Sequence, residues 1–305
     1  MANMYDVVYF GGSFVDKKDA RLSIASSAVL YGLSVYTVFP VCLDADGNLQ
    51  AFRLKDHFSR LQNSARIIGI DTFTDYTYES FEQKVRDLVH KNNVQTDVYV
   101  RATVHVDEDI AGTRSRGLST KLSMFIYDAQ PILKPEGCRL KTSVWRRIPD
   151  YSIPSRAKVN GAYVNSVLAK QDAIDCGYDD SIFLDAHGHV CELSAANIFI
   201  VRDGELITPS RTSDLLEGVN RRSLIQVARD NGITVTERTV DLTELYIADE
   251  AFACGTSANI SPILEIDSRS INGGMAGPIT QKLQKLHADM RYGRVERYAD
   301  WLTKL

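Results

Sequence analysis

The residues best suited to chemistry are a lysine and two short segments of small residues in the second half of the chain. Lys158 stands in Ala157-Lys158-Val159-Asn160-Gly161, and small neighbours let a cofactor approach the backbone. A lysine amine with a depressed pKa can act first as a nucleophile and then as a base. Local context alone favours an ordinary surface lysine, so the rest of the pattern must decide.

Two segments predict anion binding. In Leu216-Glu217-Gly218-Val219-Asn220-Arg221 a glycine frees the backbone where a helix starts, and the amides there suit a phosphate. In Cys254-Gly255-Thr256-Ser257-Ala258 a strand ends in small residues whose amides and hydroxyls can form a nest. Either segment could simply end its element, but two in one domain favour a phosphate site. The glycine motifs of dinucleotide and P-loop sites do not occur.

The first half of the chain reads as one α+β unit. Helical spacing of apolar residues predicts helices over 54–68 and 79–91, the first ended by Gly69. Alternation predicts a hairpin over 5–15 and strands over 34–41, 97–106 and 122–127. Strands, two helices and further strands make a compact α+β domain over residues 1–127.

The second half predicts a larger domain behind a connection. Four prolines between 128 and 155 indicate an interdomain segment there, which leaves residues 156–305 as the second domain. We expect helices over 163–176, 218–231 and 278–290, and a short helical piece over 242–248. We expect strands over 181–185, 190–193, 197–202, 205–208 and 250–254. In the first of these helices Val164, Val167, Leu168, Gln171 and Ile174 fall on one face.

Composition excludes several classes of protein. The 305 residues predict about two domains, and 44% hydrophobic with 24% charged residues is typical of a globular protein. A net charge of -4 gives no basic field for nucleic acid, and no apolar run approaches the ~20 residues that span a bilayer. Residues 1–6 lack the apolar core of a signal peptide, which predicts a cytoplasmic protein.

Cysteine and histidine usage does not indicate a metal centre. Five dispersed cysteines without a C-x-x-C pair predict reduced thiols. His187, His189 and Cys191 have the alternating spacing that could ligate zinc from one face of a strand. However, residues 185–188 are typical of a hairpin tip, where polar side chains are simply solvated, so we expect no metal.

The wider set of motifs spans nearly the whole chain, and its densest part lies in the second half. Its members are Tyr5-Asp6, Ala157-Lys158, Gly161, Tyr163, Gly177-Tyr178-Asp179, Leu184-Asp185, Glu192, Asn197-Ile198-Phe199, Thr208-Pro209, Leu216-x-Gly218-Val219-x-Arg221, Ala248-Asp249-Glu250, Gly255-Thr256, Pro262, Gly277-Pro278 and Trp301-Leu302-Thr303. This set resembles the fold-type IV pyridoxal-phosphate enzymes, and among them the branched-chain aminotransferases. The interval from lysine to acid, 192 − 158 = 34, also matches the family pattern.

The resemblance implies a two-domain α+β fold like that of D-amino-acid aminotransferase and a cofactor, pyridoxal 5'-phosphate. Lys158 would form the Schiff base and move the proton, and Glu192 would keep the pyridine nitrogen protonated. The remaining cofactor contacts would come from Tyr163 to the phenolic oxygen and, at the phosphate, from Arg60, Leu216, Val219, Asn220 and Thr256.

The resemblance also implies a small-molecule amino donor, a 2-oxo acid acceptor and a homodimer or larger homo-oligomer. The matching substrate positions are Tyr31, Tyr36, Tyr99 and Arg101, with backbone amides of Ser257 and Ala258 for the substrate carboxylate. Tyr99 and Arg101 share one face of a strand, so they could instead be cross-strand packing residues.

One segment departs from the branched-chain pattern. That pattern follows the aromatic at position 36 with Glu-Gly-x-Arg, whereas this chain has Thr37-Val38-Phe39-Pro40. The loop over 107–116 is unusually charged, and its Arg114 and Arg116 could reach a carboxylate or lie solvated. Four functions therefore stay open: transfer from a branched-chain-type L-amino acid to 2-oxoglutarate, a D-amino-acid or (R)-amine transaminase, an aminodeoxychorismate-type lyase, and a cofactor-binding protein without turnover.

Overall fold

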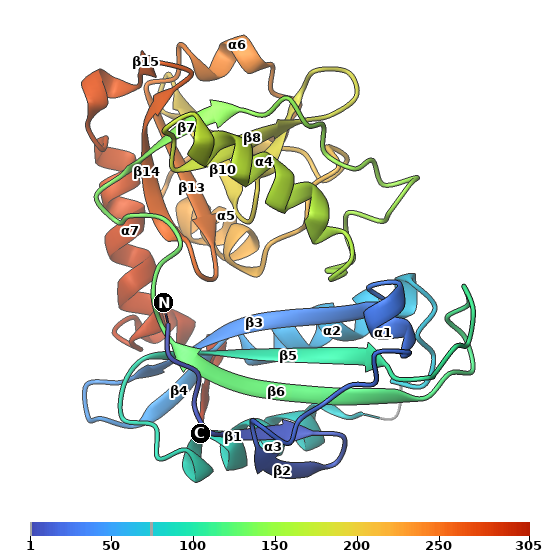
Figure 1. Cartoon of the computed structure of the whole chain (residues 1–305). Helices are drawn as coiled ribbons and strands as arrows, with labels where there is room; N and C mark the ends of the chain where they lie inside the picture. Colours follow the sequence, from blue (N-terminus) through green and yellow to red (C-terminus); the bar gives the residue numbers. More distant parts are fainter. Residues whose placement is uncertain (1, 74–75) are drawn as a thin grey trace. The chain divides into compact units, whose positions relative to one another are not determined.

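The computed structural model of the chain describes residues 2–73 and 76–305 (Figure 1). It divides into two compact units, each with its own sheet. The first comprises Met1–Gln130, Ala157–Ala162 and Met290–Leu305. The second comprises Pro131–Arg156 and Tyr163–Asp289.

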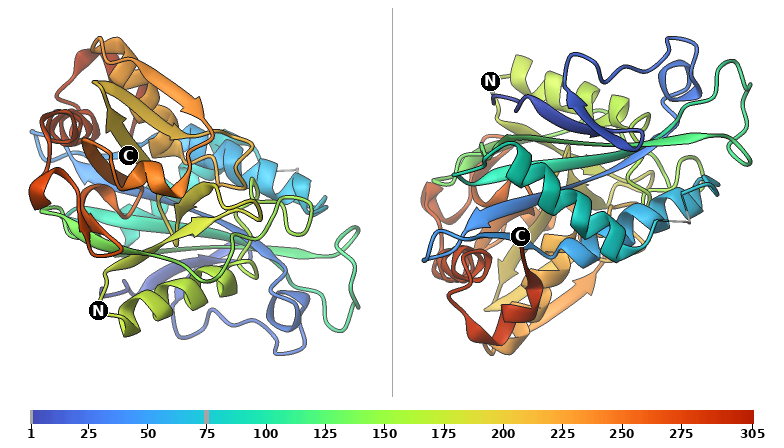
Figure 2. Two further views of the ribbon diagram at one scale, coloured as in Figure 1. Left: turned by 90° about the horizontal axis from the view of Figure 1, so that it is seen from above. Right: turned by 90° about the horizontal axis from the view of Figure 1, so that it is seen from below.

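The first unit is an antiparallel sheet with two long helices. Its strands are β1 (Val7–Phe10), β2 (Ser13–Asp16), β3 (Ser34–Leu43), β4 (Leu49–Phe52), β5 (Val98–Val106), β6 (Thr120–Asp128) and β16 (Leu302–Lys304). They lie in the order β16-β4-β3-β5-β6-β1-β2. A short helix, α1 (Ser27–Leu30), precedes β3. Helices α2 (Leu54–Ile67) and α3 (Tyr78–Lys91) cover one face of the sheet (Figure 2).

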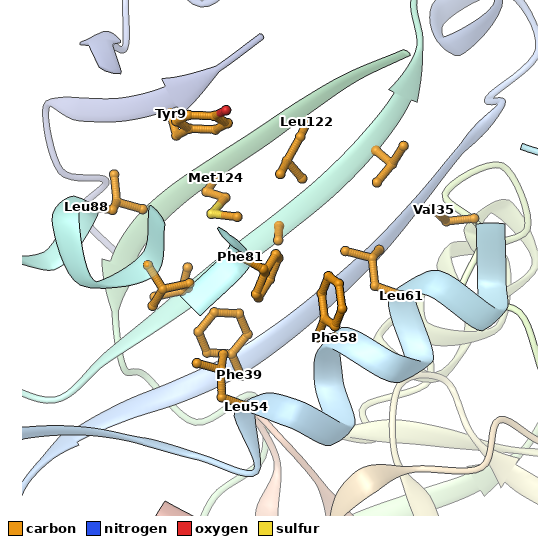
Figure 3. Close-up of a cluster of buried hydrophobic side chains, with 14 of the residues drawn as sticks. Tyr9, Val35, Phe39, Leu54, Phe58, Leu61, Phe81, Leu88, Leu122 and Met124 are labelled. Carbon is orange, nitrogen blue, oxygen red and sulfur yellow. The ribbon is translucent and has the colours of Figure 1, made fainter. Parts of the chain in front are cut away.

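Alternate side chains of β5 point to opposite faces of the sheet, and only one set lies in the core of this unit. Val98, Val100, Ala102, Val104 and Val106 are buried in the core with side chains of α2 and α3, such as Phe58, Leu61, Phe81 and Leu88 (Figure 3). The intervening residues Tyr99, Arg101, Thr103 and His105 point to the opposite face of the sheet. A slip of one residue would exchange the two sets, so burial of the apolar set fixes the register.

The second unit is built on a larger mixed sheet. Its strands are β7 (Cys138–Thr142), β8 (Asp180–Leu184), β9 (Val190–Leu193), β10 (Asn197–Arg202), β11 (Glu205–Pro209), β12 (Val235–Arg238), β13 (Glu250–Gly255), β14 (Asn259–Ile266) and β15 (Arg269–Ser270). The order is β12-β11-β10-β13-β14-β7-β8-β9, and β15 pairs with β14. Strand β7 runs parallel to both of its neighbours, and β11 runs parallel to β12.

Four α-helices complete the description of the second half of the chain. They are α4 (Tyr163–Asp175), α5 (Val219–Asp230), α6 (Leu242–Leu245) and α7 (Pro278–Arg291), with 3-10 turns η1 (Asn272–Gly274) and η2 (Glu296–Trp301). Helix α7 ends where the chain returns to the first unit, and η2 belongs to the first unit. Helix α4 packs on β8, and α5 packs on β13 and β12.

The division differs from the expected one at three places. The proline-rich stretch 128–155 is more than a connection, because β7 within it pairs with β8 and β14. Residues 290–305 belong to the first unit, since β16 pairs with β4. Residues 157–162, which include Lys158, also belong to the first unit, where Val159 bridges to Val35.

The structure confirms the hairpin at 185–188. This turn joins β8 to β9, and His189 Nδ1 lies 3.1 Å from Asp185 Oδ2. Cys191 instead packs with Ala169 and Phe183 in a small buried apolar cluster. Among residues 2–73 and 76–305, no group of three or more histidine, cysteine or acidic residues could hold a metal ion. Within the same ranges, no helix has the length and apolar character needed to cross a membrane.

Candidate active site

Lys158 is held by its backbone against strand β3 and helix α2. Its carbonyl accepts a hydrogen bond from Tyr36 N at 3.0 Å, and its amide donates to Ser64 Oγ at 3.0 Å. Three residues later Gly161 N donates to Gly32 O at 3.2 Å. A Cβ on Gly32, whose φ is +63°, would lie 2.8 Å from Gly161 Cα, so this close approach requires glycine. The segment that carries Lys158 is therefore fixed on both sides.

Tyr36 brings Lys158 and Arg101 together. Lys158 Nζ lies 4.9 Å from the centroid of the Tyr36 ring, and Arg101 Cζ lies 3.6 Å from the same centroid. The negative face of an aromatic ring attracts cations at these distances. The Tyr36 side chain is only 5% exposed and is therefore buried rather than on the surface. Three of the predicted site residues thus form one cluster in the first unit.

Arg60 is oriented by two buried side chains. Its Nη2 donates to Thr37 Oγ1 at 3.2 Å, and Thr37 Oγ1 lies 2.9 Å from His57 Nδ1. Thr37 and His57 are both fully buried. Ser64, which binds the Lys158 amide, also donates from its Oγ to Arg60 O at 2.8 Å. The predicted phosphate arginine and the predicted catalytic lysine therefore share a neighbour on α2.

The other predicted substrate residues of this unit differ in exposure. Tyr99 is 1% exposed and packs against Tyr127, with ring centroids 5.7 Å apart. Tyr31 caps the C-terminal end of α1 and is 48% exposed. Arg114 and Arg116 lie in the loop between β5 and β6. The substrate roles of these four residues stay predictions.

His105 is neutral at physiological pH. It lies on the same face of β5 as Arg101, and its Nε2 lies 2.8 Å from Ser123 Oγ. Burial of the ring, and then the positive charge of Arg101, lower the pKa of His105 to about 4. Arg101 is therefore the charged member of this pair.

In the second unit Glu192, on β9, lies among three donors. Its Oε1 accepts from Arg147 Nε at 3.0 Å, and its Oε2 accepts from Asn197 Nδ2 at 3.2 Å. Leu216 N lies 3.2 Å from both oxygens. The carboxylate is only 7% exposed, so an ion pair and amide donors take the place of water around its charge. Sequence reasoning found Glu192 but missed Arg147, which no local motif distinguishes.

The two predicted phosphate segments meet in this unit. Gly218 is the N-cap of α5 and no side chain caps this helix. A Cβ there would lie 2.3 Å from Asn197 Oδ1. Asn220 Nδ2 donates to Gly255 O at 2.8 Å, which ties the start of α5 to the end of β13. Residues 256–258 form the turn into β14, and Ile132 N donates to Ser257 O at 2.9 Å.

The start of α5 has the properties of an anion site. The first amides of a helix lack partners within the helix, and its dipole favours negative charge there. Asn220 Oδ1 is buried and has no hydrogen-bond partner in the part of the chain that the structure describes. Tyr163, the remaining predicted cofactor residue, is the first residue of α4. The second unit therefore offers a carboxylate, an uncapped helix terminus and a phenol.

The first unit offers a lysine beside cationic and aromatic groups, and the second offers a buried carboxylate and a helix-terminal anion site. These features agree with the resemblance to fold-type IV pyridoxal-phosphate enzymes. Residues 34–266 match the sequence profile of the class IV amino-transferases, and the chain belongs to this family. It is an aminotransferase.

Its relatives resemble it along the whole chain. The branched-chain-amino-acid aminotransferase of Pseudomonas aeruginosa is 35% identical over 99% of this chain and 98% of its own length. The crystal structure of the branched-chain aminotransferase of Thermoproteus uzoniensis with norvaline has a TM-score of 0.94 and 37% identity, covering 99% of both chains. The T.th. branched-chain amino acid aminotransferase complexed with N-(5'-phosphopyridoxyl)-L-glutamate has a TM-score of 0.91 and 33% identity, covering 98% of both chains.

The residues present fit pyridoxal 5'-phosphate, the cofactor of this family. The first unit supplies an amine and a guanidinium, and the second supplies a carboxylate, whose charge complements a protonated ring nitrogen. The uncapped N-terminus of α5 suits a phosphate. When bound, the cofactor supplies an electron sink for the substrate carbanion.

Proposed function

We propose that this aminotransferase transfers the amino group of a branched-chain-type L-amino acid to 2-oxoglutarate. The observation that carries the proposal is likeness over the full chain, at 33–37% identity, to enzymes named for branched-chain substrates. One of those structures holds an adduct of L-glutamate, the amino acid formed from 2-oxoglutarate.

Each predicted cofactor residue has a definite task under this proposal. Lys158 holds the cofactor covalently and then carries a proton to and from the substrate Cα on its released amine. Glu192, supported by Arg147, keeps a proton on the ring nitrogen. Arg60 and the amides of Val219 and Asn220 hold the phosphate, with Leu216 and Thr256 as its neighbours, and Tyr163 donates to the phenolic oxygen.

On the substrate side, the amides of Ser257 and Ala258 bind the α-carboxylate. Tyr31, Tyr36 and Tyr99 shape the substrate pocket, and Arg101 provides its positive charge.

A second candidate, a D-amino-acid or (R)-amine transaminase, is favoured by the segment after Tyr36. Thr37 places a hydroxyl against His57 and Arg60, where the branched-chain pattern has a carboxylate. Val38, Phe39 and Pro40, which occupy the remaining three positions of that pattern, are buried. Because the acid and the arginine of the pattern are missing here, this part of β3 should bind different charged groups of a substrate.

Single amino donors without an acceptor distinguish the candidates. We expect the yellow absorbance of the purified holoenzyme to bleach to that of the pyridoxamine form when L-leucine or L-valine is added, because the donor leaves its nitrogen on the cofactor. D-alanine and an (R)-arylalkylamine are the comparison donors. The measurement is the visible spectrum at one donor concentration for all four compounds.

Each other outcome rejects a specific statement. Bleaching only by D-alanine or the (R)-amine rejects the L-amino-acid specificity. The Thr37–Pro40 segment would then be the decisive departure from the branched-chain pattern. Release of pyruvate from aminodeoxychorismate without an acceptor indicates the lyase. A protein that never becomes yellow with pyridoxal phosphate lacks the Lys158 chemistry.

We also propose that the enzyme is a homodimer whose interface includes helix α4. The apolar face expected from the sequence is exposed: Val164 and Val167 are 65% and 63% exposed, while the smaller Ala169 and Ala173 are buried. Val144 and Trp145 are also exposed and directly precede Arg146. Asn165 of α4 binds the segment that follows them: its Nδ2 donates to Arg146 O, and its Oδ1 accepts from Ile148 N. An apolar patch of this kind on a folded protein is typical of an interface.

A charge in this face is expected to separate the subunits. Val167→Glu would place a carboxylate in the desolvated contact, so we expect light scattering to give the mass of one chain instead of two. Ile247→Glu is the matched control, because Ile247 is equally 63% exposed but lies outside α4. A dimer that persists in Val167→Glu contradicts the proposed interface, and a wild-type monomer contradicts the homodimer itself.

We propose that the enzyme works in the cytoplasm, as the sequence predicts. Cys42, Cys138, Cys176, Cys191 and Cys254 are all free thiols. Unpaired cysteines are typical of a reducing compartment, which supports this assignment.

A further inference from the structure

Asn197, the first residue of β10, is buried and uses both hydrogens of its side-chain amide. Its Nδ2 donates to Glu192 Oε2 at 3.2 Å and to Leu216 O at 2.9 Å. Because a carboxylate and a carbonyl only accept, the nitrogen must face both of them, and Oδ1 must point away from them. The side chain is therefore held in one orientation.

Leu216 completes a closed set of hydrogen bonds with this asparagine. Its N lies 3.2 Å from both oxygens of Glu192, while its O accepts from Asn197 Nδ2. Leu216 lies two residues before Gly218, the N-cap of α5. Glu192, Asn197 and the chain that leads into α5 thus contact one another pairwise, and all of them belong to the second unit.

The oxygen of the Asn197 side chain fills the space that a side chain at position 218 would need. A Cβ on Gly218 would overlap this oxygen, whereas the next nearest atoms, Arg221 Cβ and Asn197 Cγ, would lie 3.5 Å away at ordinary contact distance. The backbone of Gly218, with φ −60° and ψ 139°, is one that any residue adopts. Glycine is therefore required at this position by the asparagine and not by the backbone conformation.

We propose that Asn197 is a positioning residue that couples the carboxylate of Glu192 to the anion-binding N-terminus of α5. Its nitrogen fixes Glu192 and Leu216 together, and its oxygen fixes how closely Gly218 approaches them. Both of its hydrogens are used, so it has no donor left for an anion and acts on one only through the backbone before α5.

This inference rests on the proposed function, which assigns Glu192 to the ring nitrogen of the cofactor and the start of α5 to its phosphate. Under that assignment one asparagine fixes the distance between the groups that bind the two ends of the cofactor. A change at Asn197 should therefore affect both ends, and the need for glycine at position 218 should disappear with the asparagine.

The first experiment needs no ligand. In the cofactor-free full chain, Gly218→Ala should lower the Tm by roughly 2–4 °C or more, because the new methyl group overlaps Asn197 Oδ1. In an Asn197→Ala background the oxygen is gone, so Gly218→Ala should cause no further loss. In an Asn197→Asp background an oxygen is still there, and the loss should return. Equal losses in all three backgrounds, or no loss in the wild type, overturn the assigned reason for the glycine.

The second experiment measures anion binding. Inorganic phosphate is the probe, titrated by calorimetry into the cofactor-free full chain. We expect Asn197→Ala to weaken phosphate about tenfold, because the amides at the start of α5 lose the hydrogen bond that fixes them. Asn231→Ala is the matched control, since Asn231 Nδ2 donates to Val227 O at the other end of the same helix, at 2.8 Å. Unchanged affinity in Asn197→Ala, or an equal loss in Asn231→Ala, overturns the proposal.

The third experiment tests the other end of the coupling. At saturating pyridoxal phosphate, Asn197→Ala should lower kcat about tenfold, because Glu192 loses an orienting donor, while the KM for the amino donor stays close to that of the wild type. A wild-type kcat would show that Asn197 supports the anion site alone, which overturns the coupling.

An aspartate at position 197 separates hydrogen bonding from shape. Asn197→Asp keeps the size of the side chain but turns an acceptor toward Glu192 and Leu216 O, which are also acceptors. We expect it to lose at least as much phosphate affinity and kcat as Asn197→Ala. Wild-type values in Asn197→Asp would show that the side chain only fills space, and would overturn the proposal.

The outcomes keep this inference apart from the proposed function. If the wild type transfers no amino group, yet phosphate binding and the loss in Gly218→Ala both depend on Asn197, the proposed function is wrong and the coupling stands. If the wild type is active as proposed but both Asn197 variants match it in phosphate affinity and kcat, the function stands and this inference fails.

Discussion

Replacing Lys158 by alanine is expected to lower turnover by about 10⁴-fold or more while the protein stays folded. The side chain supplies both the covalent attachment and the base, and loss of a positioned base alone costs up to about 10⁴-fold. The backbone bonds of Lys158, to Ser64 Oγ and from Tyr36 N, do not involve the side chain and survive the change. Steady-state turnover with the best donor and a far-ultraviolet spectrum of the same sample check both parts.

Two further lysine variants show that the effect is specific. Lys158→Arg keeps a positive charge near the Tyr36 ring but cannot lose its proton near neutral pH, so it should be as inactive as the alanine variant. Lys285→Ala, which removes an 84% exposed lysine on α7, should retain full activity. Added methylamine should restore part of the turnover in Lys158→Ala, because a free amine can replace the missing base. Substantial unaided turnover in Lys158→Ala would refute the assigned role.

The sequence predicts the amphipathic helices closely. Expected bounds of 54–68 and 79–91 compare with Leu54–Ile67 and Tyr78–Lys91. Each helix has a clear apolar stripe, which packs into the core that Figure 3 shows. A periodic pattern of this length determines an element without knowledge of its partner.

Sequence reasoning misses strands that depend on a distant partner or that contain a proline. Strand β16 has three residues and exists because it pairs with β4, some 250 positions earlier. Strand β14 contains Pro262, and a proline within a short run argues against a strand. The pattern of β16 is not visible locally because its partner is distant in the sequence. That of β14 is obscured by its proline, although its partner β13 immediately precedes it.

Helix α4 shows a different limit of pattern reading. The apolar face at Val164, Val167 and Leu168 is real, but it is exposed and the small residues face the sheet. Periodicity identifies which residues share a face and does not say what covers that face. A second subunit is the covering that we propose.

Motif reading found the reactive side chains but not the residues that hold them. Lys158, Tyr36 and Arg101 form the expected cluster. Asn160 Oδ1 accepts from Arg101 Nη2 across 59 positions, and Arg147 Nε donates to Glu192 Oε1 across 45. Such supporting residues have no signature of their own, because their function depends only on a contact formed by folding.

Glu192 is expected to affect rate and stability separately, and two substitutions divide these effects. Glu192→Gln keeps the size of the side chain and one acceptor oxygen but removes its charge. We expect turnover to fall by about 10²-fold, as when one preorganised electrostatic partner of the reacting group is lost. The cofactor should still bind. Visible absorbance at saturating pyridoxal phosphate and steady-state kcat measure the two properties.

Glu192→Ala should lose more stability than Glu192→Gln. Both variants leave the Arg147 guanidinium, 12% exposed, without its carboxylate, and breaking a buried pair costs about 3–5 kcal/mol. Only glutamine keeps an oxygen that can accept from Arg147 Nε. The free energies of unfolding of the two variants should therefore differ by about 1.5–3 kcal/mol, the size of a hydrogen bond to a charged group, while both turn over slowly. Glu244→Gln is the control: Glu244 accepts from Arg238 Nη1 at 2.8 Å on α6, so its loss should affect stability alone. Wild-type rates in Glu192→Gln would remove Glu192 from the site, whereas equally slow turnover in both variants, despite their different stabilities, identifies its charge as the catalytic property.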